Sequence, residues 1–186
     1  VQMLQPPRQA APRSVAELAE AYAQHVASQA GGQPVLLAGF SVGGVAALET
    51  ARRLNELGVP VRALVLIDSV FPRWLFRQRW LWRSMGWLTR SLYVQELTMN
   101  GRRLDAMFKD AGLVSQVLAL KDYRVRPYPG EVILIRTSGL ARWQHWLFGP
   151  WQRRLSGSLQ VQEVEGLHGS IFEPGRFFTG LAHHRS

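Results

Sequence analysis

Residues 35–49 decide the fold of this chain, and they read VLLAGFSVGGVAALE. An apolar run comes first, the pattern G-x-S-x-G follows at residues 39–43, and a helix-prone run ends the stretch. This order is typical of a nucleophile elbow, a tight turn that holds a serine hydroxyl above a sheet. Both glycines of the pattern are expected to be needed, because a side chain there would collide with the neighbouring strand or helix. We therefore predict that Ser41 is a nucleophile; a plain strand-to-helix turn is the alternative.

Helical and strand patterns alternate around this elbow. Ser14 and Glu17 form a capping box, and apolar residues spaced by three and four then indicate an amphipathic helix that ends near residues 31–32. Residues 61–67 are nearly all apolar, as in a parallel strand covered on both faces. The alternation predicts an α/β fold with a parallel sheet. Strands are predicted at 35–40, 61–67, 132–136 and 159–164, and a second helix is predicted at 43–57, stopped by Gly58.

The composition indicates one globular domain that spans residues 1–186. The chain is 47% hydrophobic, enough for a sizeable core at this length. It has no cysteine, which excludes disulfides and thiolate metal ligands and fits the reducing cytoplasm, the location we expect. Its first residues lack the basic segment and apolar run of a signal peptide, and no apolar run is long enough to span a bilayer.

The charge of the chain is strongly positive. It carries 22 basic and 13 acidic residues, a formal charge of +9, and nearly all the basic residues are arginines. Such a surface can bind nucleic acid, an anionic membrane or an acidic protein, or can simply be solvated. Nucleic acid is not expected as a partner, because no helix-turn-helix, zinc-finger or RNA-binding signature accompanies the charge.

A nucleophilic serine needs a base, which is usually histidine because its pKa lies near the working pH. His168 lies in a glycine-flanked loop directly after the last predicted strand and is the candidate base among the five histidines. His145, in a tryptophan-rich segment, is a weaker candidate and fits a packing role as well.

The base in turn needs a carboxylate that orients the imidazole and stabilises its cation. Asp68 directly follows the predicted strand 61–67, so it is expected at the carboxyl edge of the sheet, where sites of open α/β sheets form. The segment that ends the next strand, residues 135–139, has no acid, which favours Asp68. Glu131 and Glu173 are weaker candidates, and the alternative for Asp68 is that it caps the following turn.

Together these residues resemble the thioesterase domains that end nonribosomal peptide and polyketide synthases. The resemblance implies an α/β-hydrolase fold with a mostly parallel central sheet. An acid placed directly after strand 61–67 is similar to the type I members of the family, which release products rather than edit them. The resemblance is carried by residues 4–7, by 39–44 with 51–54, by 64–69 and by 166–174.

The resemblance also implies a reaction and a partner. Ser41 would attack a thioester on the phosphopantetheine arm of an acyl or peptidyl carrier protein, and water or an internal hydroxyl or amine would release the chain by hydrolysis or macrocyclisation. The backbone N–H of Val42 would be one donor of the oxyanion hole, and neither a metal nor a bound cofactor is required. The alternatives are an esterase that acts on small acyl esters, or a truncated, non-catalytic module that docks a carrier.

Members of the family begin with a strand and a glycine-rich loop ahead of the segment that matches Val1. That loop donates the second N–H of the oxyanion hole. Neither feature is found in this sequence, so we expect the chain to be a fragment of a larger polypeptide or a degenerate member of the family.

Residues 72–120 break the alternation of strands and helices. The family places a helical lid over the serine here, and the tryptophans of this segment would line the acyl chamber while its arginines face an acidic carrier. The alternatives are ordinary helix packing and contact with a membrane surface, of which the membrane is not expected. The four tryptophans are Trp74, Trp80, Trp82 and Trp87.

Overall fold

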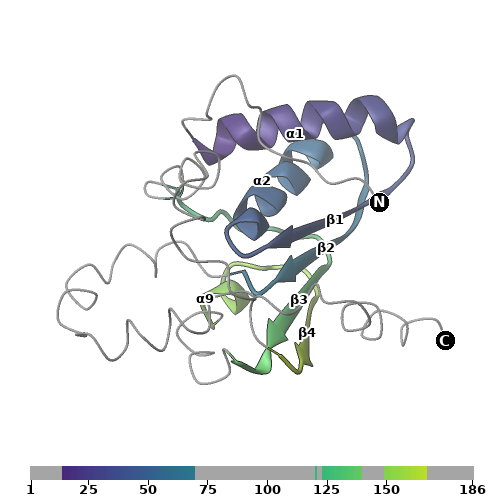
Figure 1. Cartoon of the computed structure of the whole chain (residues 1–186). Helices are drawn as coiled ribbons and strands as arrows, with labels where there is room; N and C mark the ends of the chain where they lie inside the picture. The colour runs from purple at the N-terminus through teal and green to yellow at the C-terminus, as the bar shows by residue number, and fades with distance from the viewer. Residues whose placement is uncertain (1–13, 70–119, 121–122, 140–148, 167–186) are drawn as a thin grey trace, which may run out of the picture.

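The computed structural model describes residues 14–69, 120, 123–139 and 149–166 (Figure 1). Their centre is a sheet of four parallel strands in the order β1-β2-β3-β4. The strands are β1 (Val35–Phe40), β2 (Val61–Ile67), β3 (Val132–Thr137) and β4 (Leu159–Val164), and the helices are α1 (Val15–Ala30), α2 (Gly43–Glu56) and α9 (Gly149–Gln152). The predicted α/β fold with a parallel sheet is confirmed.

The ends of the two long helices follow the predicted signals. The backbone N–H of Glu17 donates to Ser14 Oγ at 3.1 Å, which caps α1 at its start. Gly31 ends α1 with a φ of 55°, in the left-handed region that favours glycine. Helix α2 ends at Glu56, one residue before the prediction, because Leu57 has left the helical conformation and Gly58 follows with a φ of 76°.

The helices α1 and α2 lie on one side of the sheet, with α2 next to the strands and α1 beyond it (Figure 1). Alternate residues of each strand face opposite sides of the sheet. On β2, Leu64 and Leu66 pack with α2 in the main core, whereas Val65 and Ile67 belong to a second buried cluster with β3. Burial on both faces explains why this strand is almost entirely apolar.

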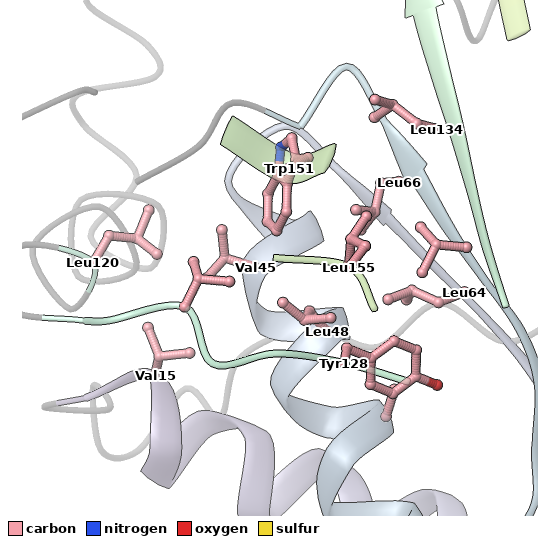
Figure 2. Packing of buried hydrophobic residues seen from close by; sticks show 13 residues of the cluster. Val15, Val45, Leu48, Leu64, Leu66, Leu120, Tyr128, Leu134, Trp151 and Leu155 are labelled. Carbon is pink, nitrogen blue, oxygen red and sulfur yellow. The ribbon is translucent and has the colours of Figure 1, made fainter. Parts of the chain in front are cut away.

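The main core joins α1, α2, α9 and the sheet (Figure 2). Its largest side chain, Trp151 of α9, is fully buried, as is Tyr128 in the segment that leads into β3. The core side chains labelled in Figure 2 are Val15, Val45, Leu48, Leu64, Leu66, Leu120, Tyr128, Leu134, Trp151 and Leu155.

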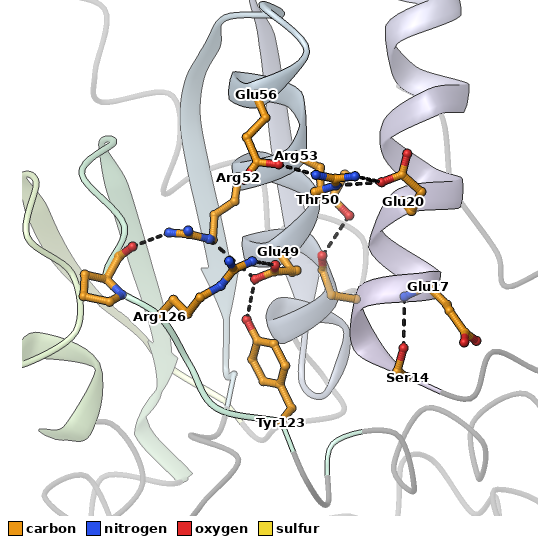
Figure 3. A network of polar contacts seen from close by, with 12 residues as sticks. Ser14, Glu17, Glu20, Glu49, Thr50, Arg52, Arg53, Glu56, Tyr123 and Arg126 are labelled. Atoms are coloured by element: carbon orange, nitrogen blue, oxygen red, sulfur yellow. Dashed lines mark hydrogen bonds and ion pairs between the residues drawn. The ribbon is translucent and has the colours of Figure 1, made fainter.

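A buried carboxylate ties the segment before β3 to the middle of α2 (Figure 3). Glu49 is 2% exposed, and it accepts a hydrogen bond from Tyr123 Oη at 2.7 Å. The same carboxylate pairs with the guanidinium of Arg126 and lies 3.7 Å from Nε of Arg52. Arg52 also donates to the carbonyl oxygen of Pro127, so that α2 holds this segment at several points.

The predicted lid, about residues 72–120, lies outside the described residues apart from Leu120, and residues 1–13 lie outside them as well. Among the described residues, no helix has the length and apolar character to cross a membrane.

We expect Glu49→Gln to lower the free energy of unfolding by about 1–3 kcal/mol, because at this buried position an amide nitrogen would then face a donor, the Tyr123 hydroxyl or the Arg126 guanidinium. The matched control is Glu56→Gln, on the same helix and also paired with an arginine but 46% exposed. The control should cost less than about 1 kcal/mol. Urea unfolding of both variants measures the difference, and equal costs would contradict a structural role for the buried network.

Burial and the hydrogen bond to Glu49 raise the pKa of Tyr123 well above its usual value. A raised pKa in the folded state means that stability is complete below the unfolded pKa, about 10, and is lost as the pH rises beyond it. We expect the free energy of unfolding to fall above about pH 10, and Tyr123→Phe to make that fall shallower. Part of the fall should remain in the variant, because burial also raises the pKa of Tyr22 and of Tyr128. Identical alkaline profiles for the variant and the parent chain would contradict this assignment.

Candidate active site

Ser41 lies at the turn between β1 and α2, in the conformation of a nucleophile elbow. Its φ is 53°, a left-handed value that costs a residue other than glycine about 1–3 kcal/mol and that persists only when the surroundings impose it. The backbone N–H of Ser41 donates to the carbonyl oxygen of Ile67 at 2.8 Å, so β2 holds the turn in place.

Close packing at Gly39 and Gly44 enforces this turn. A Cβ atom built on Gly39 would lie 2.5 Å from the carbonyl oxygen of Gly43, and one built on Gly44 would lie 1.9 Å from Ser69 Oγ. No atom of the described residues outside its own turn and helix lies within 4 Å of a Cβ built on Gly43. The expectation that both glycines of G-x-S-x-G are needed is therefore wrong for Gly43, and Gly44 is the residue that lets α2 approach the end of β2.

Asp68 directly follows β2, at the same edge of the sheet as Ser41. Phe40 of β1 pairs with Ile67 of β2, and Ser41 and Asp68 are the residues that directly follow them, so both lie at the same edge of the sheet. Asp68 is fully buried and has a φ of 45°. The location predicted for it at the carboxyl edge of the sheet is confirmed.

The Asp68 carboxylate is bound by one residue of the neighbouring strand. The backbone N–H of Thr137 donates to Oδ1 at 2.7 Å, and the Thr137 hydroxyl donates to Oδ2 at 2.6 Å. The backbone N–H of Asp68 in turn donates to the carbonyl oxygen of Ile135 at 2.8 Å. The end of β3 thus holds both the main chain and the side chain of Asp68.

Two buried residues next to Asp68 complete this edge. The Ser69 hydroxyl donates to the carbonyl oxygen of Gly39 at 3.1 Å, which connects the end of β2 to the elbow strand. The indole N–H of Trp151 donates to the carbonyl oxygen of Ser69 at 2.7 Å. Sequence reasoning missed Ser69, Thr137 and Trp151, whose partners lie far away along the chain.

Of the remaining candidate residues, the structure describes Val42 but not His168 or the four tryptophans. Val42 lies at the start of α2, directly after Ser41, where the positive end of the helix dipole favours negative charge. His168 and the four tryptophans Trp74, Trp80, Trp82 and Trp87 lie outside the described residues. Within the described ranges, no group of histidines and carboxylates could hold a metal ion.

The fold and this elbow define a class of protein. The family profile of the thioesterase domain matches residues 1–185, and the chain belongs to that family. It is 31% identical to the orsellinic acid synthase armB of Armillaria mellea, in an alignment of 180 residues. That alignment covers 86% of this chain and 8% of the synthase, so the chain spans a small part of the curated relative that it matches.

Solved thioesterases have the same α/β-hydrolase fold. The thioesterase domain NocB, in covalent complex with a fluorophosphonate nocardicin G analog, is 26% identical with a TM-score of 0.61, over 87% of this chain and 68% of that one. RedJ, a thioesterase of the prodiginine pathway of Streptomyces coelicolor, has a TM-score of 0.70 at 21% identity, over 98% of this chain and 76% of its own.

Gly44→Ala should lower the free energy of unfolding by about 1–3 kcal/mol or more, because the added methyl group has no room beside Ser69. The matched control is Gly43→Ala one position away, which should be neutral or stabilising, because alanine favours a helix over glycine by up to about 1 kcal/mol. Denaturant unfolding of the two variants compares them directly. A Gly44→Ala variant as stable as the control would show that the contact with Ser69 does not constrain the elbow.

Proposed function

We propose that this chain is a serine thioesterase that releases an acyl or peptidyl chain from the phosphopantetheine thioester of a carrier protein. The observation that carries the proposal is the left-handed Ser41 at the start of α2, with the buried Asp68 at the end of the adjacent strand. Membership of the thioesterase domain family supports this reaction class.

In the proposed first step, the Ser41 hydroxyl attacks the thioester carbonyl while His168 takes its proton. Negative charge develops on the carbonyl oxygen, where the N–H of Val42 and the N-terminus of α2 stabilise it. The C–S bond then breaks, the phosphopantetheine thiol leaves with the proton returned by His168, and an acyl ester remains on Ser41.

In the second step, a water molecule gives a proton to His168 and attacks the acyl ester. The C–O bond to Ser41 breaks, and the serine recovers its proton as the carboxylic acid leaves. Asp68 holds the imidazole in the tautomer that both steps need and stabilises its cation. An internal hydroxyl or amine in place of water would give a ring.

Hydrolysis is the release that we favour. By its name, the relative from Armillaria mellea makes orsellinic acid, a free carboxylic acid, which is the kind of product that water releases from an acyl ester. Trp74, Trp80, Trp82 and Trp87 are proposed contacts of the acyl chain. The positive charge of the chain suits an acidic carrier protein as partner, and the lack of cysteine suits the cytoplasm.

The first test is the intact mass of the chain after exposure to a fluorophosphonate, the class of reagent found in the NocB complex. A single adduct should form and should be absent from Ser41→Ala. Ser28→Ala is the matched control, because Ser28 is exposed on α1 and its hydroxyl donates to the carbonyl oxygen of His25 in the same helix. Asp68→Asn should slow the labelling by a factor of about 10⁴, as replacement of a triad acid by asparagine does.

No adduct on a chain that circular dichroism shows to be folded would contradict the proposal. A matched pair of substrates, one acyl group as thioester and as oxyester, separates a thioesterase from an esterase. We expect the larger kcat/KM for the thioester, and a preference for the oxyester would favour the esterase.

A further inference from the structure

The end of β3 carries no acid, yet three consecutive residues there bind both Asp68 and Gly166, which lies two residues before His168 in the sequence. Thr137, the last residue of β3, is fully buried and donates to both oxygens of the Asp68 carboxylate. Ser138 and Gly139 follow Thr137 directly and bind Gly166 on the other side of this strand end.

That other side is Gly166, two residues after the end of β4 and two residues before His168. Its backbone N–H donates to Ser138 Oγ at 3.1 Å, and its carbonyl oxygen accepts from the N–H of Gly139 at 2.9 Å. Gly166 has a φ of 139°, a value that residues other than glycine rarely adopt. The start of the segment that carries His168 is therefore bound to the residues that adjoin Thr137.

We infer that residues 137–139 are a positioning segment, in which Thr137 orients the Asp68 carboxylate and Ser138 with Gly139 holds Gly166, two residues before His168. The inference rests on the proposed function, because it assigns Asp68 and His168 to one relay. The short segment binds Asp68 on one side and Gly166 on the other, so that the end of β2 and the chain after β4 are both tied to one strand end.

The chemistry of the contact explains why a threonine suits this position. A carboxylate offers about four acceptor sites, and Thr137 donates to one on each oxygen, which fixes the plane of the carboxylate. Hydrogen bonds to an ionised acceptor are stronger than neutral ones, and burial of both partners removes competition from water.

Thr137→Val removes the hydroxyl donor at nearly constant volume, and Thr137→Ser keeps it. We expect Thr137→Val to lower kcat on an acyl thioester, and the rate of fluorophosphonate labelling, about tenfold or more with KM unchanged. Thr137→Ser should stay within about threefold of the parent chain, because the donor to Oδ2 is retained. Rates are compared at a temperature at which circular dichroism shows every variant to be folded.

The Asp68→Asn background separates positioning from general support of the structure. If Thr137 acts through Asp68, the effect of Thr137→Val on labelling should shrink to about twofold or less once Asp68 is replaced. An effect of the same size in both backgrounds would overturn the inference, as would wild-type rates in Thr137→Val.

Ser138→Ala tests the other side of the segment, and because Ser138 is exposed the substitution should not unfold the chain. We expect Ser138→Ala to slow labelling about threefold to tenfold in the parent chain. In a His168→Ala chain, adding Ser138→Ala should cause no further loss of labelling rate.

A parent chain that is not labelled at Ser41 would defeat the proposed function itself. A labelled parent chain with unchanged Thr137→Val and Ser138→Ala variants would defeat only this inference.

Discussion

The contact between Gly44 and Ser69 is the constraint on which the site depends. Without a side chain on Gly44, α2 approaches the end of β2 so closely that a single methyl group would overlap Ser69 Oγ. That approach leaves the chain between β1 and α2 room only for a sharp turn, and Ser41 adopts a left-handed conformation there. The strain is tolerated because the sheet and α2 determine the turn from both sides.

The same edge of the sheet buries several polar groups, and each one described is bound within the fold. Ser69 donates to the elbow strand, Trp151 donates to Ser69, and Thr137 binds Asp68. A buried polar group without a partner costs about 1–3 kcal/mol, so these contacts favour one arrangement of the strand ends over its alternatives. Rigid placement of polar groups before the substrate arrives is also what electrostatic stabilisation of a transition state requires.

Much of the fold could be predicted from the sequence, because local patterns determine it. Three local patterns each predict the structure of one short segment: the capping box at Ser14, the apolar run of β2 and the G-x-S-x-G pattern. The need for Gly44 rather than Gly43, and the contact of Thr137 with Asp68 across 69 positions, depend on residues that only the folded sheet brings together. The buried Glu49 was missed for the same reason, because its partner Tyr123 is 74 positions away.

The most direct test of the central claim is to mix the chain with a carrier protein that bears an acyl phosphopantetheine thioester and to follow both proteins by intact mass. We expect the carrier to lose the acyl mass, and the chain to gain it transiently at Ser41. The Ser41→Ala variant should leave the carrier loaded. A carrier that stays loaded in the presence of a chain whose Ser41 reacts with a fluorophosphonate would contradict the carrier-bound thioester as substrate.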